Sequence, residues 1–177
     1  MSDPTSPGDE AVEVVDLSGD VVEIVSRRRM RAERLRHRAT FIAVVDETGR
    51  LLVHQRSPAK DVWPSRWDIA AGGVAAVGET WAVAAARELE EELGLRLELT
   101  SLGTEAYEDE DVATLGAIFT AVLLSSRHAE VRFADGEVVD ARWVTRDELD
   151  AMVRRESFCP DSLALVLPRL GGPDPRS

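Results

Sequence analysis

The 177-residue sequence contains one cysteine, Cys159, which excludes an internal disulfide framework. No apolar run approaches the roughly 20 residues that a membrane-spanning helix requires, and the polar, acidic N-terminus lacks the pattern of a signal peptide. Basic residues are also scarce: 21 Lys and Arg stand against 33 Asp and Glu, a formal net charge of −12. A nucleic-acid polymer or an anionic membrane is therefore not expected as the main partner. The single cysteine fits a reducing, cytoplasmic setting.

The remaining composition is typical of one folded domain. The chain is 44% hydrophobic and 31% charged, and its length suits a single sizeable core. We predict a domain over residues 11–170, flanked by disordered tails at 1–10 and 171–177. The acidic balance does not exclude a nucleotide, because a bound metal ion can carry the positive charge.

Hydrophobic patterning predicts strands interspersed with helices. Two hairpins are expected at residues 12–25 and 39–55, with a short basic helix after Ser26 between them. Helices are also expected at 79–93, after Thr145 and at 160–170, and strands at 67–71, 96–103, 115–124 and 137–143. This order predicts an α+β domain with α/β/α layers. The first hairpin and the basic helix could form a homodimer contact or cover the sheet.

The helix expected at residues 79–93 carries a dense acidic cluster, R-E-L-E-E-E, at positions 87–92. At 100° per residue, Glu88 and Glu92 lie roughly 40° apart, with Glu91 roughly 60° to the other side of Glu88. Like charges at this spacing repel, so the face is either simply solvated or binds a cation. Mg²⁺ commonly takes a few carboxylates together with waters and substrate phosphates. The opposite face is predicted to be buried through Ala82, Ala85, Ala86, Leu89 and Leu93.

The spacing around this cluster resembles the Nudix box. Gly73 is followed after five residues by Glu79, after seven more by Arg87-Glu88-Leu89, and then by Glu91-Glu92 and Gly94-Leu95. The resemblance implies the Nudix fold, in which a mixed sheet lies between helices. It also implies hydrolysis of a diphosphate joined to another group, here a nucleoside diphosphate derivative or a similar small diphosphate, with Mg²⁺ or Mn²⁺ as cofactor.

Matching positions of the box imply roles for individual residues. The metal ligands would be Glu88, Glu91 and Glu92, with the carbonyl of Gly72 joining them. Glu79 would lie near the metal, and Arg87 would hold the acidic side chains in place by pairing with one of them.

A carboxylate must also accept a proton from the attacking water. Glu91 or Glu92 can serve as this base, and a base outside the box is also common in the family. Glu108, Glu110 and Glu137 are the outside candidates. We favour Glu137 because it opens a predicted strand, whereas the EDED run at 108–111 is typical of a solvated loop.

The loop before the box contains candidate substrate-binding residues. Arg56 and Lys60 could meet phosphate oxygens as charge-assisted donors, although ordinary surface charge would explain them equally well. Trp67, together with Trp63, could line a substrate pocket, although loop packing is the commoner role for such a pair.

A wider stretch resembles the Nudix branch around isopentenyl diphosphate isomerase. The resemblance lies in LRHRAT at 35–40 and GRLLVHQRSPAKDVWPSRWD at 49–68. It raises an alternative, allylic isomerisation without hydrolysis. However, Ala71 stands where the isomerases have a catalytic cysteine, and Gly73 stands where they have a metal-binding histidine. Cys159 lies far from the box and is expected to pack in the core. Hydrolysis is therefore favoured, and a nucleotide-sensing domain without turnover is the other alternative.

Overall fold

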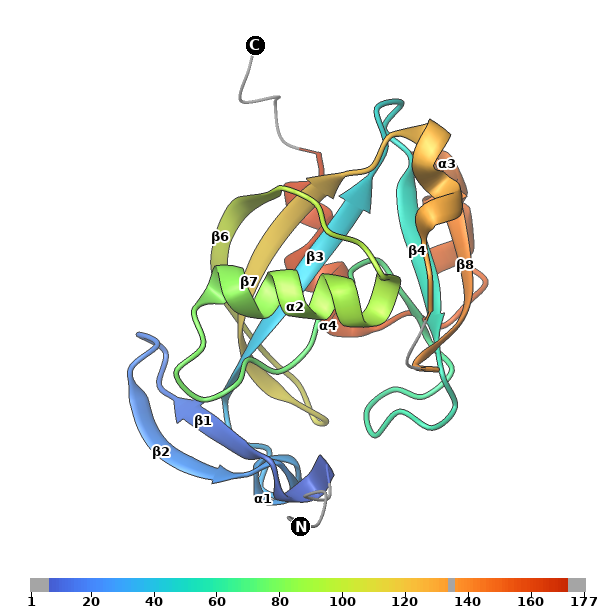
Figure 1. Ribbon diagram of the computed structural model, residues 1–177. Helices are drawn as coiled ribbons and strands as arrows, with labels where there is room; N and C mark the ends of the chain where they lie inside the picture. Colours follow the sequence, from blue (N-terminus) through green and yellow to red (C-terminus); the bar gives the residue numbers. More distant parts are fainter. Residues whose placement is uncertain (1–6, 134–135, 172–177) are drawn as a thin grey trace.

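The computed structural model describes residues 7–133 and 136–171, which form a mixed sheet with helices on both faces (Figure 1). The strands are β1 (Ala11–Val15), β2 (Val21–Ser26), β3 (His37–Val45), β4 (Leu51–Arg56), β5 (Trp67–Asp68), β6 (Leu99–Glu108), β7 (Ala113–Val122) and β8 (Val138–Val144). The α-helices are α1 (Arg27–Ala32), α2 (Trp81–Leu93), α3 (Arg146–Val153) and α4 (Pro160–Leu165). Short 3-10 helices occur at Pro7–Asp9, Ser125–Glu130 and Leu167–Arg169.

Strand β3 is the centre of the sheet. It pairs in parallel with β7 over its whole length, and β7 pairs antiparallel with β6. Its near-continuous apolar sequence suits a strand buried on both faces. One face packs Phe41 and Ala43 against the core that contains Leu165 of α4, and the other packs Ile42 with Leu89 of α2. This arrangement confirms the predicted α/β/α layers.

The predicted hairpin at residues 39–55 is present only at its turn. Strands β3 and β4 share one pair, Val45 with Leu51, and then diverge as β4 pairs with β8. The segment after β5 runs beside β3 instead: Ile42 N donates to Ala71 O at 2.7 Å, and Thr40 N donates to Gly73 O at 2.9 Å. Sequence spacing indicated the turn but not this insertion, which brings the two box glycines to the central strand.

The ends of the helices follow local capping chemistry. Thr80 accepts a hydrogen bond from Val83 N, so α2 begins at Trp81 rather than at Glu79. Gly94, at φ 66°, ends α2 as predicted. Thr145 and Glu148 form a capping box at the start of α3. Helix α1 begins after Ser26 as predicted but stops at Ala32, four residues earlier than the basic run suggested.

The buried face of α2 differs from the predicted one. Ala85, Leu89 and Leu93 are buried as expected, but Ala82 and Ala86 are exposed, and Ala84 and Glu92 are buried in their place. The buried stripe is therefore rotated toward the acidic side of the helix. As a consequence, one of the carboxylates predicted to face away from the core is enclosed by protein.

The N-terminal hairpin of β1 and β2 lies beside the loop that leads into α2. Val12, Val14 and Val25 form a small core with Met30 and Val74, so the hairpin covers this end of the domain. Its outer face exposes Val21, Val22 and Ile24. A homodimer contact there stays a prediction.

The described residues include part of the predicted N-terminal tail. Pro7–Asp9 is helical, and Asp9 pairs with Arg28 at 2.9 Å, so these residues belong to the fold rather than to the predicted tail. Residues 1–6 and 172–177, which make up most of both predicted tails, lie outside the described residues. Within the described residues, the structure contains no helix long and apolar enough to cross a membrane.

Candidate active site

Two adjacent glycines bring the backbone against both β3 and the acidic face of α2. Gly72 has φ +152°, and a Cβ there would lie 1.9 Å from Thr40 O. A Cβ on Gly73 would lie 2.7 Å from Glu88 Oε2. Any larger residue would push the strand or the carboxylate away. The glycines are therefore needed to bring the strand-to-helix connection under Glu88.

Arg87 is the centre of the acidic cluster. Its guanidinium pairs with Glu79 at 2.9 Å, Glu88 at 2.6 Å and Glu91 at 3.0 Å. Hydrogen bonding to Arg87 is the main cause that lowers the pKa of Glu79, and Ala76 N also donates to that carboxylate at 2.9 Å. The geometry agrees with the structural role predicted for Arg87. One cation is shared among three acids, so the group retains negative charge.

Two carboxylates of the cluster are shielded from water. The Glu92 side chain is only 3% exposed, and its Oε2 accepts from Gly72 N at 3.0 Å. Burial raises the pKa of Glu92, and it raises the pKa of Glu88 to about 7 even though Arg87 opposes that shift. Glu91 differs, with its side chain 54% exposed. Burying carboxylates is costly unless positive charge compensates them, so the solvated-face alternative does not describe Glu88 and Glu92.

Glu137 approaches the cluster from another part of the chain. It immediately precedes β8, which begins one residue later than the predicted strand, and its carboxylate contacts Lys60 Nζ. Lys60 Nζ also lies 3.4 Å from Glu92 Oε1. The other two proposed bases lie elsewhere: Glu108 pairs with Arg36 at 2.6 Å, and Glu110 is exposed on the turn after β6. The fold therefore brings only Glu137 of these three next to the box.

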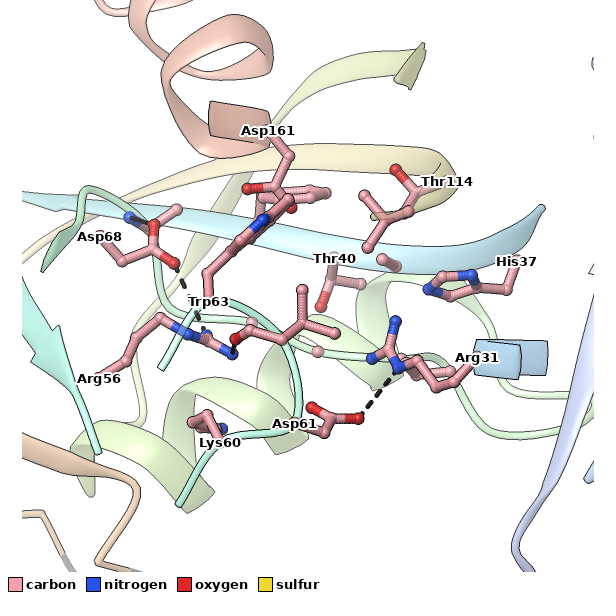
Figure 2. A pocket seen from close by; sticks show the side chains of 18 of the residues that line it. Arg31, His37, Thr40, Arg56, Lys60, Asp61, Trp63, Asp68, Thr114 and Asp161 are labelled. Carbon is pink, nitrogen blue, oxygen red and sulfur yellow. Dashed lines mark hydrogen bonds and ion pairs between the residues drawn. The ribbon is translucent and has the colours of Figure 1, made fainter. Parts of the chain in front are cut away.

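Two connected cavities open between the box and the N-terminal elements. The outer one, about 910 Å³, is lined by Glu88, Glu91 and Glu137. The inner one, about 110 Å³, is lined largely by polar residues (Figure 2). Both include Lys60, Gly72 and Gly73. They form one cleft with the carboxylates at its mouth.

Basic side chains line the opposite side of this cleft. Arg31 and Arg56 point into the inner cavity from different sides (Figure 2). Arg31 pairs with Asp61 at 3.0 Å, and Arg56 lies 3.8 Å from Asp68. Arg27 and Lys60 line both cavities. Positive charge in a chain of net charge −12 is thus gathered where the acidic helix face opens.

The structure separates the residues predicted to bind substrate. Arg56 and Lys60 line the cleft, but Trp67 does not line either of its cavities. The Trp67 indole is buried in the main core, with the Arg142 guanidinium 4.6 Å from its ring centroid. This position does not support the predicted substrate role of Trp67. Trp63, held at φ 47°, lines the inner cavity instead.

The inner end of the cleft also contains residues that the sequence did not single out. Arg27 and Arg31 were visible only as part of a basic run, and their i, i+4 spacing was the available signal that they share one helix face. Asp161 of α4 lines the same cavity, and burial together with the Asp68 charge raises its pKa to about 8. Cys159 is fully buried, and burial raises the pKa of its thiol, as expected for a packed rather than a reactive residue.

The donor set suits a hard divalent cation, although the ligands are not assembled around one point. Among the described residues, no group of three or more His, Cys, Asp or Glu side chains converges as a ready metal site. Glu88 and Glu91 nevertheless line one cavity with the Gly72 backbone, and all offer oxygen donors. The two carboxylates together carry more negative charge than the single Arg87 guanidinium compensates. The residues therefore fit Mg²⁺ or Mn²⁺ chemically.

Comparison with known proteins places this cleft in a family. The NUDIX domain profile matches residues 35–161, and the chain belongs to the Nudix hydrolase family. It is 39% identical over 160 residues to the uncharacterised Nudix hydrolase YfcD of Escherichia coli K12, covering 89% of this chain and 86% of that one. An uncharacterised Nudix hydrolase of Yersinia pestis is also 39% identical, over 155 residues, with coverages of 87% and 82%.

Solved structures agree on the fold. DR0079 from Deinococcus radiodurans superposes with a TM-score of 0.76 at 24% identity, covering 92% of this chain and all of that one. The NUDIX domain of Shewanella oneidensis NrtR, solved with ADP ribose, gives a TM-score of 0.58 at 17% identity over 73% of this chain and 83% of that one. The predicted Nudix fold is therefore confirmed. The resemblance to isopentenyl diphosphate isomerase receives no support from these matches.

Proposed function

We propose that this protein is a hydrolase dependent on Mg²⁺ or Mn²⁺ that cleaves the diphosphate linkage of a nucleoside diphosphate derivative or a similar small diphosphate. The observation that carries the proposal is the presence of acidic and basic side chains in one cleft. Glu88 and Glu91 line its outer cavity, Arg31 and Lys60 line both cavities, and Arg56 lines the inner one. A diphosphate bridged to a metal on one side and to cations on the other would fit this arrangement.

The metal would be held by Glu88, Glu91 and Glu92, with the Gly72 carbonyl close by. When bound, such an ion neutralises phosphate charge and acidifies water. Lys60, Arg56 and Arg31 would orient the phosphate oxygens, and their partial burial strengthens those contacts. Trp63 would border the group attached to the diphosphate.

Two carboxylates are suited to accept the proton of the attacking water. Glu91 is exposed to the outer cavity, and Glu137 stands at its mouth beside Lys60. Glu92, also a predicted base, is enclosed and held by Gly72 N and Lys60, which favours a ligand role for it. We infer that Glu91 or Glu137 holds the proton.

The inner cavity is more compatible with a polar leaving group than with a prenyl chain. Beside apolar residues such as Phe41, Val62 and Val112, its lining includes the charged side chains of Arg31, Arg56, Asp68 and Asp161. A hydrocarbon tail gains stability only where it displaces water from apolar surface, and it would instead desolvate these polar groups. This lining, together with Ala71 at the cysteine position, disfavours isomerisation.

A substrate panel tests the proposal directly. Nucleoside diphosphates, sugar nucleotides, ADP ribose, dinucleotides, coenzyme A and isopentenyl diphosphate would each be incubated with Mg²⁺, with Mn²⁺ or with EDTA. ³¹P NMR would follow the products. Metal-dependent cleavage of at least one diphosphate is expected. Tight binding of a member with no turnover of any would instead support a sensor, and isomerised isopentenyl diphosphate would support an isomerase.

A further inference from the structure

Glu13 of β1 joins the N-terminal hairpin to the loop that precedes α2. Its side chain is 9% exposed, and its Oε1 accepts a hydrogen bond from Gly78 N at 2.8 Å. Its Oε2 accepts from Arg38 Nη1 at 2.9 Å. Glu13 lies upstream of residues 35–161, the part of the chain that matches the NUDIX domain profile. A buried carboxylate outside that region therefore contacts the box loop.

Arg38 extends this contact to the first residue of α2. Its guanidinium carbon lies 4.1 Å from the ring centroid of Trp81, a favourable position for a cation over an aromatic face. Arg38 itself is on the central strand β3. The hairpin, the centre of the sheet and the start of α2 are thus linked through two side chains, Glu13 and Arg38.

Glu13 holds the loop at the backbone amide of Gly78. It has φ +74°, a conformation that glycine adopts at little cost. Around it, Ala75 N donates to Arg38 O at 3.0 Å and Glu79 N donates to Ala76 O at 3.1 Å. The Gly78 amide is instead held by the Glu13 carboxylate. Without that acceptor, the turn at Gly78 would lose its hydrogen bond to the hairpin.

The next residue carries the constraint to the acidic cluster. The Glu79 carboxylate accepts hydrogen bonds from Arg87 Nε at 3.0 Å and from Arg87 Nη2 at 2.9 Å. The same guanidinium contacts Glu88 and Glu91 through Nη1. A shift of the loop at Gly78 would therefore move Glu79, then Arg87, and then the two carboxylates that Arg87 holds.

We propose that Glu13 is a positioning residue for the active site: by holding the Gly78 amide, it fixes the Glu79–Arg87 pair that orients Glu88 and Glu91 toward the metal. This inference rests on the proposed metal-dependent function. An alternative is that Glu13 only anchors the hairpin through its ion pair with Arg38. The two roles predict different exchange rates for the Gly78 amide and different metal affinities in a Glu13 variant.

The first measurement is amide hydrogen exchange of the full-length protein without metal. Glu13→Ala is expected to speed exchange at Gly78 and its loop neighbours. Glu13→Gln keeps a carbonyl oxygen that can accept from Gly78 N, so it should restore most of the protection. The matched control is Glu23→Ala, in the same hairpin, where Glu23 pairs with Arg29 on the surface. That control should leave the loop unchanged.

The second measurement is Mn²⁺ affinity by calorimetry for the same variants. Residues that orient ligands typically change metal affinity 10- to 100-fold when replaced, and we expect Glu13→Ala to weaken Mn²⁺ binding about tenfold. Glu13→Gln should stay within about threefold of the parent protein, and Glu23→Ala should match it. Unchanged Gly78 exchange, or unchanged Mn²⁺ affinity, in folded Glu13→Ala would overturn the proposal.

The outcomes separate this inference from the proposed function. If the parent protein cleaves no diphosphate while Glu13→Ala still alters Gly78 exchange and Mn²⁺ affinity, the function fails and the positioning role stands. If the parent cleaves a diphosphate and Glu13→Ala leaves exchange and affinity unchanged, the positioning role fails and the function stands. Should Glu13→Ala not fold, Glu13→Asp, whose carboxylate is one methylene shorter, takes its place. Faster Gly78 exchange together with weaker Mn²⁺ binding would support the role, and an unchanged value of either would overturn it.

Discussion

Two short stretches of this chain carry four acidic side chains each, yet the fold treats them in opposite ways. One is the run at residues 87–92 on α2, and the other is the EDED run at 108–111, where β6 ends. In sequence they look alike. In the structure, the first faces a cleft and contains buried carboxylates, whereas the second closes a surface turn.

Most carboxylates of the EDED run have separate hydrogen-bond donors nearby. Asp109 accepts from Tyr107 Oη at 2.8 Å and from the amides of Asp111 and Val112 at 2.8 and 2.9 Å. Asp111 accepts from Trp63 Nε1 at 2.9 Å, and Glu108 pairs with Arg36. Most of its acidic side chains thus have a donor nearby, so the run has little electrostatic reason to recruit a cation.

The α2 run shares its donors instead. Arg87 is the cation shared by Glu79, Glu88 and Glu91, and Glu92 is enclosed with Lys60 as its neighbouring cation. Of the acids in this run, Glu90 has a separate partner in Arg96. The comparison teaches that the distribution of donors and burial is what distinguishes the two acidic clusters. The number of carboxylates is the same in both runs.

The largest expected effect comes from neutralising the enclosed carboxylate. Glu92→Gln should lower kcat for the best substrate of the panel by at least about 100-fold, because a metal ligand is lost. The midpoint temperature of thermal unfolding in EDTA should not decrease, because the substitution removes a buried charge. Glu110→Gln is the matched change in the other run and should leave both values unchanged. Activity that survives Glu92→Gln would exclude Glu92 from the metal site.

The second test removes the shared cation. Arg87→Met should destabilise the protein by about 2 kcal/mol, a buried-pair loss reduced by solvent screening, because three carboxylates lose their common partner. Urea unfolding in EDTA measures this. In the EDED run, Arg36→Met leaves Glu108 with Arg34 at 3.5 Å, so a loss below about 1 kcal/mol is expected. Equal losses would mean that donor sharing at Arg87 has no energetic consequence.

The sequence predicted the helix of the Nudix box better than it predicted the surrounding cleft. Residues 73–95 follow one local spacing, and their helix caps act within a few residues, so Thr80 and Gly94 set α2 without tertiary information. The α/β/α layers followed from the order of strands and helices. These features depend on short-range physics that a single sequence records.

The cleft depends on long-range pairing that spacing does not encode. The placement of residues 69–75 beside β3 separates β4 from its predicted partner and directs Trp67 inward and Trp63 outward to the cavity. Two tryptophans four residues apart in one loop carry no local signal for this choice. Glu13 was likewise unpredicted, because its partner Gly78 lies 65 residues away.

A third, smaller effect concerns the cation beside Glu92. Lys60 contacts both Glu92 and Glu137, and a metal ion entering between these carboxylates would have to compete with it. Lys60→Met should therefore bind Mn²⁺ a few-fold, about threefold, more tightly in calorimetry without substrate. Arg34→Met, beside Glu108, is the matched change and should not alter Mn²⁺ affinity. Weaker Mn²⁺ binding by Lys60→Met would show that Lys60 orders the site rather than competing for it.

The smallest effect concerns the pH dependence of the free energy of unfolding that the EDED run contributes. Burial alone acts to raise the pKa of Asp109, but donation from Val112 N, Tyr107 Oη and Asp111 N outweighs burial and leaves the pKa below its ordinary value of 3.8. An acid whose pKa is depressed in the folded state stabilises the fold above its unfolded pKa and loses that contribution as the pH falls through the folded value. Asp109→Asn should therefore lower the free energy of unfolding by about 1 kcal/mol at pH 7, and the difference from the parent should shrink below pH 3.8. Glu92→Gln in the same metal-free urea titration should show no such loss at pH 7. If both substitutions destabilise the protein alike, the contrast between the two acidic runs is not one of donor supply.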